Sequence, residues 1–120
     1  MIDSKVVEAF HMMWGSFPEP VALVHKSREV MAVNAICHST GRMDVGMNCA
    51  MPGLSDCHKG CLADQALDSR KAVFRKRVYG TREIISYWIP VDGYPELFVH
   101  FGVGVSVNYN EMADHAIIRA

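Results

Sequence analysis

The stretch 17–36, with Pro18 and Pro20 near its start, constrains the fold more than any other part of the sequence. The prolines prevent a helix from continuing through them, so the apolar run that follows is predicted to be a strand. The runs 21–24 and 30–33 both have strand length, and the polar residues between them are typical of a turn. The pattern therefore predicts an antiparallel hairpin.

Helices are predicted on both sides of this hairpin. Asn34 is a strong N-cap residue, so a short helix is expected directly behind it, closing at Gly41 in the C′ position. In front of the hairpin, residues 3–14 are predicted to form an amphipathic helix, because Val6, Phe10 and Met13 fall on one face. Asp3 or Ser4 is expected to cap it.

The middle of the chain is the least regular part. Residues 42–61 follow Gly41 and are interrupted by glycines at 46, 53 and 60 and by Pro52, so short helices are expected there. A longer helix is predicted from Cys57 or His58 to about Arg70, with Leu62, Ala66 and Leu67 as its apolar stripe.

The last third is predicted to form three strands, at 72–79, 82–91 and 96–107. The third of these alternates cleanly between two faces. The face that begins with Leu97 and Val99 is assigned to the core, and the face that begins with Phe98 and His100 is expected to be the outer one. His100 is therefore expected to be a polar residue of the outer face.

The order of these features resembles the PAS domain. The resemblance rests on Phe17, Pro18, Val21, the polar turn, Val33-Asn34-Ala35 and the glycines at 41 and 46. It implies an α+β fold: a PAS-like five-stranded antiparallel sheet with helices over one face and an extra N-terminal helix. The expected division is 1–16 for that helix, 17–108 for the PAS core and 109–120 for a tail or linker. Where many PAS domains end in an Asp-Ile-Thr-like motif, this chain has Ser106-Val107-Asn108.

Size and charge limit the function. The 120 residues suffice for one domain, and a net charge of −1 provides no basic surface for nucleic acid or anionic membrane. No apolar run is long enough to span a bilayer, and the N-terminus lacks the pattern of a signal peptide, so a cytoplasmic location is expected. Because no catalytic motif is found, the chain is expected not to be an enzyme.

The four cysteines leave several interpretations open. Cys49, Cys57 and Cys61 lie close together in sequence, with Cys37 one helix earlier, and with Cys37 or His58 they are candidate ligands for zinc or an iron–sulfur cluster. A reversible disulfide and ordinary structural thiols are the alternatives. If 57–70 is helical, Cys57 and Cys61 would share one face. The resemblance to haem-binding PAS proteins also makes His58 a candidate haem ligand.

The resemblance implies a sensory or interaction module of a bacterial signalling protein, such as a kinase of a two-component system, a cyclase or a transcription regulator. It implies a small ligand between the helical segment 34–70 and the sheet, a homodimer formed through the N-terminal helix and the outer sheet face, and an effector domain on the same or another chain. Two alternatives remain: a metal- or redox-responsive module that uses Cys49, Cys57 and Cys61, and a small enzyme with a hydrophobic cavity.

Overall fold

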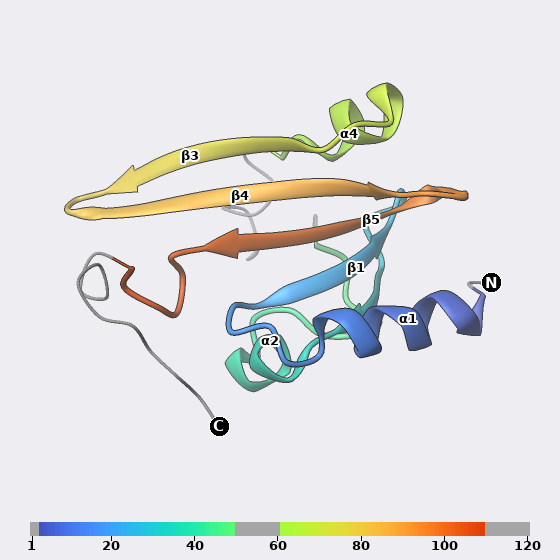
Figure 1. Cartoon of the computed structure of the whole chain (residues 1–120), viewed down its shortest axis with the longest axis horizontal. Coiled ribbons are helices and arrows are strands. Elements are labelled where there is room, and N and C mark those ends of the chain that lie inside the picture. Colours follow the sequence, from blue (N-terminus) through green and yellow to red (C-terminus); the bar gives the residue numbers. More distant parts are fainter. Residues whose placement is uncertain (1–2, 50–60, 110–120) are drawn as a thin grey trace.

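The computed structural model describes residues 3–49 and 61–109, and its sheet is antiparallel throughout. Five strands lie in the order β2-β1-β5-β4-β3, so β5 is central and β3 is at an edge. Figure 1 shows β3, β4, β5 and β1 in this order, with α1 beside β1. The elements in chain order are α1 (Ser4–Trp14), β1 (Val21–His25), β2 (Val30–Val33), α2 (Ala35–Thr40), α4 (Ala63–Ser69), β3 (Val73–Tyr79), β4 (Arg82–Val91) and β5 (Tyr94–Val103). The predicted fold class is therefore confirmed.

The predicted caps of the first two helices are confirmed. Asp3 accepts a hydrogen bond from the backbone N–H of Lys5 at the start of α1. Asn34 accepts one from the N–H of Cys37 at the start of α2, and Gly41 closes α2 in the left-handed conformation, with a φ of 68°. Both helices therefore begin where a side-chain oxygen satisfies an otherwise unpaired donor.

Both faces of the sheet are buried at β1 and β5, because the residues of these two strands alternate between two cores. The inner face, which α2 and α4 cover, contains Ala22, Val24 and Phe98. The outer face, which α1 covers in part, contains Leu23 and Val99, together with Phe10 of the helix. The prediction that the Leu97 and Val99 face is core is confirmed. The prediction that the Phe98 and His100 face is the outer one is wrong.

Two predicted boundaries are also wrong. β5 ends at Val103 rather than at 107, because Gly104 adopts a φ of 94° and turns the chain out of the sheet. α4 begins at Ala63, and Cys61 and Leu62 precede it without helical structure. Cys61 therefore cannot share a helical face with Cys57, which itself lies outside the described residues.

Candidate functional site

The centre of the inner face carries a stacked pair of aromatic rings. His100 of β5 lies opposite Trp88 of β4, and their ring centroids are 4.8 Å apart with 20° between the planes. Trp88 is buried among the residues of the inner core, and α4 packs on both β4 and β5. A residue expected on the outer face is thus part of the layer beneath the helices.

A backbone hydrogen bond fixes the protonation of His100. Nδ1 lies 2.8 Å from the carbonyl oxygen of Tyr87. Because a carbonyl can only accept, Nδ1 must carry the proton, which leaves Nε2 as the acceptor in the neutral ring. Burial lowers the pKa of His100, and the bond to Tyr87 only partly opposes this effect. The inner face therefore presents a neutral imidazole of defined tautomer.

Arg28 lies at the rim of this face, in the turn between β1 and β2. Its guanidinium lies over the ring of Phe98, 5.7 Å from the centroid, and donates to Asp64 of α4 at 2.8 Å. Burial would lower the pKa of Arg28, but the hydrogen bond to Asp64 and the charges of Cys61, Asp64 and Cys49 raise it overall. Arg28 thus links the hairpin turn to α4 across the edge of the inner core.

The candidate metal and haem ligands fall in different places. Cys49 and Cys61 are half-buried and pack against the inner core, whereas Cys37 is buried in α2 with its Sγ 3.6 Å from the carbonyl oxygen of Met43. Cys57 and His58 lie outside the described residues. Within 3–49 and 61–109, no three His, Cys, Asp or Glu side chains come together as a metal site. The four-cysteine site and the haem ligand stay predictions.

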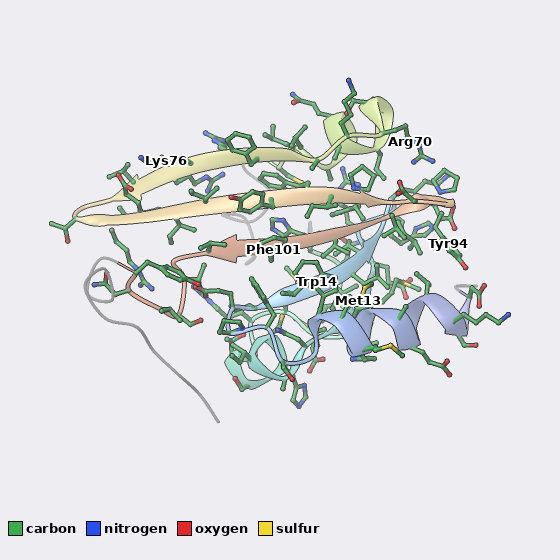
Figure 2. All side chains as sticks on the ribbon, viewed as in Figure 1. Met13, Trp14, Arg70, Lys76, Tyr94 and Phe101 are labelled. Carbon is green, nitrogen blue, oxygen red and sulfur yellow. The ribbon has the colours of Figure 1, made fainter. Side chains whose placement is uncertain are left out.

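A groove separates α1 from the outer face. Its volume is about 280 Å³, and Phe10, Met13 and Trp14 of α1 face Leu23 and Tyr94 across it. Figure 2 shows Trp14 beside Phe101 of β5, and their rings are 5.2 Å apart. This groove is a concave surface on the face opposite to the one predicted to bind a ligand.

One hydrogen bond closes the end of the groove. The hydroxyl of Tyr94 donates to Asp3 Oδ2 at 2.9 Å. The pKa of Asp3 is lowered, first by the N–H of Lys5 and then by Tyr94, while the same bond raises the pKa of Tyr94. The residue that caps α1 is thus tied to the first residue of β5.

Sequence reasoning missed two side chains that join elements far apart in the chain, Arg28 and Glu19. Glu19 is fully buried and binds the segment after β5. The available signal was its position between two prolines, directly before the apolar run 21–24. An acid in such surroundings is predicted to need internal hydrogen-bond donors.

The helices of the described part of the chain are all too short or too polar to cross a membrane.

No protein-family model matches the sequence, and no curated protein matches it either. Solved structures do resemble it. The PAS domain of BvgS from Bordetella pertussis matches with a TM-score of 0.64 at 16% identity, over 92% of this chain and 93% of that one. A domain of an HTR-like protein from Haloarcula marismortui matches with a TM-score of 0.57 at 18% identity, over 73% of this chain and 98% of that one.

A sensory box sensor histidine kinase from Vibrio cholerae matches with a TM-score of 0.57 at 18% identity, over 82% of this chain and 88% of that one. At these identities the likeness concerns the fold. The chain therefore has the PAS fold.

Proposed function

We propose that the chain is a sensory and interaction module, in which a change on the inner face of the sheet alters the docking of α1 on the outer face. The observation that carries this proposal is the alternation of β1 and β5. Ala22 and Phe98 enter the inner core, while their chain neighbours Leu23 and Val99 enter the outer core. The two cores are separated by one layer of backbone, so a displacement on one side must be accommodated on the other.

Two of the similar structures support a signalling role. One is a sensor histidine kinase and another is the PAS domain of BvgS. By analogy, the module proposed here is non-catalytic and passes its state to an effector domain on the same or another chain. Its ligand is a small molecule held between the segment 34–70 and the inner face.

His100 offers a test of ligand binding. Its neutral Nε2 is an acceptor, so we expect the ligand to carry an N–H or O–H donor. Purified protein is examined by native mass spectrometry, and released compounds are identified after organic extraction. A small molecule bound to the wild type should be lost in His100→Leu and kept in His11→Leu, an exposed position on α1 outside the segment 34–70. Equal retention in both variants would reject this ligand site.

Homodimerisation through α1 and the outer face forms the interaction part of the proposal. Met12 and Met13 are adjacent apolar residues of α1 that are 85% and 70% exposed, and a partner surface could cover them. In sedimentation velocity, Met12→Glu should convert dimers to monomers. The matched control is Val45→Glu, another exposed apolar residue, located in the loop after α2. A wild type that is monomeric at high concentration would refute the dimer.

A thiol-based response is the second candidate, and the position of Arg28 favours it. Cys49 and Cys61 both lie within electrostatic reach of its guanidinium. Two thiols and one hydroperoxide would give a disulfide, with both thiol protons and the peroxide oxygens leaving as water and alcohol. Mass mapping after mild peroxide treatment should then find Cys49 or Cys61 oxidised and the buried Cys37 intact. Elemental analysis for zinc and iron tests the metal form of this candidate.

A further inference from the structure

The side chain of Glu19 joins the segment before β1 to the segment after β5. Glu19 lies between Pro18 and Pro20 and has an exposure of 0%. Its Oε1 accepts a hydrogen bond from the backbone N–H of Gly104 at 2.8 Å, and its Oε2 accepts one from the N–H of Ser106 at 2.9 Å. Two residues 85 and 87 positions away in sequence are therefore held by one carboxylate.

Further donors lie around the same carboxylate. The hydroxyl of Ser106 lies 2.7 Å from Oε2 and 3.1 Å from the carbonyl oxygen of Pro18, and it can donate to one of them at a time. The Tyr109 hydroxyl is also hydrogen bonded to Glu19, and burial, together with this carboxylate, raises the pKa of Tyr109. A buried carboxylate is costly unless such donors surround it, so its contacts form or break as a group.

The segment that carries Glu19 is anchored to α1. Nδ2 of Asn34 lies 2.8 Å from the carbonyl oxygen of Glu19, 3.1 Å from that of Phe17 and 3.4 Å from that of Trp14, the last residue of α1. The chain enters β1 at the end of the sheet where β5 leaves it (Figure 1). The end of α1 and the exit of β5 are thus connected through two side chains, Asn34 and Glu19.

We propose that Glu19 is a positioning residue that couples the docking of α1 to the path of the chain after β5. With the carboxylate bound to Gly104 and Ser106, the exit segment follows the path seen here. When α1 shifts, Glu19 moves with its linker, the group of hydrogen bonds breaks and the exit segment is released. The coupling requires no ligand on the inner face, so it can fail or hold independently of the proposed function.

Amide hydrogen exchange measured by NMR tests whether Glu19 holds the segment after β5. Glu19→Gln places an NH₂ group where one oxygen accepted, so at least one backbone donor loses its partner. Losing a buried hydrogen bond to a charged group should raise exchange at Gly104 and Ser106 about tenfold or more. The control is Glu29→Gln, an exposed glutamate in the hairpin, which should leave both rates unchanged.

Ser106→Ala tests whether a change in the segment after β5 reaches α1. This variant removes only a hydroxyl group and keeps the Glu19 carboxylate and the backbone N–H of residue 106. Coupling is reciprocal. This variant should therefore raise exchange at the amides of Gly15 and Phe17, which are hydrogen bonded to His11 and Trp14 at the end of α1. It decides the question even if Glu19→Gln does not fold.

Two results would overturn the coupling. Faster exchange confined to residues 104–106 would mean that Glu19 is a static cap for the end of β5. Equally faster exchange at central amides such as those of Leu23 and Val99 would mean that the variants lower global stability only.

Discussion

Asn34 and Val21 are joined by two reciprocal hydrogen bonds. The backbone N–H of Asn34 donates to the carbonyl oxygen of Val21 at 3.0 Å, and Asn34 Oδ1 accepts from the N–H of Val21 at 3.0 Å. The same Oδ1 caps α2 through Cys37. One buried side chain therefore fixes the start of β1, the end of β2 and the first turn of α2.

Asn34→Ala should strongly destabilise the fold. The substitution removes the cap of α2 and leaves the N–H of Val21 and several carbonyl groups of the α1–β1 linker without their partner. Losing a cap and burying unsatisfied groups should together cost about 3 kcal/mol of unfolding free energy. Urea denaturation measures the change. Gln65→Ala, at an exposed position of α4, should leave the midpoint within error and serves as the control.

Gly104→Ala should be more damaging than Gly93→Ala, although both glycines have a positive φ, of 94° and 83°. A Cβ at 104 would lie 2.5 Å from the backbone oxygen of Glu83, whereas a Cβ at 93 meets nothing within 4 Å. We expect about 1 kcal/mol from backbone strain at Gly93 and about 2–4 kcal/mol at Gly104, where the clash adds to the strain. Equal losses of thermal stability would contradict this account.

The sequence predicted the elements whose signals are local. Prolines before β1, an N-cap at Asn34 and a glycine after α2 act within a few residues, and each prediction is confirmed. The prediction that alternate residues of β5 lie on two different faces of the sheet was also correct. Its assignment to faces was wrong because alternation shows that two faces differ, but not that helices cover both of them.

The candidate site was less predictable because its contacts are long-range. Arg28 is hydrogen bonded to Asp64, and Glu19 to Ser106, although the partners are 36 and 87 residues apart in sequence. The spacing of apolar residues along the sequence does not indicate which polar side chains contact each other over such separations. The end of β5 was also missed, since Val105 and Val107 continue the apolar alternation that Gly104 interrupts in the backbone.

Two arginines with positive φ should respond oppositely to replacement by glycine. Arg70 caps α4 with a φ of 59° and is exposed, so Arg70→Gly should relieve strain and stabilise the fold by about 0.5 kcal/mol. Arg28 has a φ of 78°, but its guanidinium binds Asp64 and lies over Phe98. Arg28→Gly should therefore lower stability by about 1–2 kcal/mol. The melting temperatures of both variants, measured in the same buffer, test this prediction. A higher melting temperature for Arg28→Gly would show that the contacts of the Arg28 side chain contribute little to stability.

His100 should make the fold less stable in mild acid. Burial lowers the pKa of His100 below its ordinary value of 6.5, so between the two values the unfolded chain binds a proton that the folded chain does not. Stability therefore falls as the pH drops below about 6.5, until the pH reaches the pKa in the folded state. His100→Asn removes this titration. Between pH 7.5 and pH 5.5 the unfolding free energy of the wild type should therefore fall by more than that of the variant. His11→Asn, at an exposed position of α1, is the matched control, and a shift of the same size there would mean that the pH effect does not come from the buried ring.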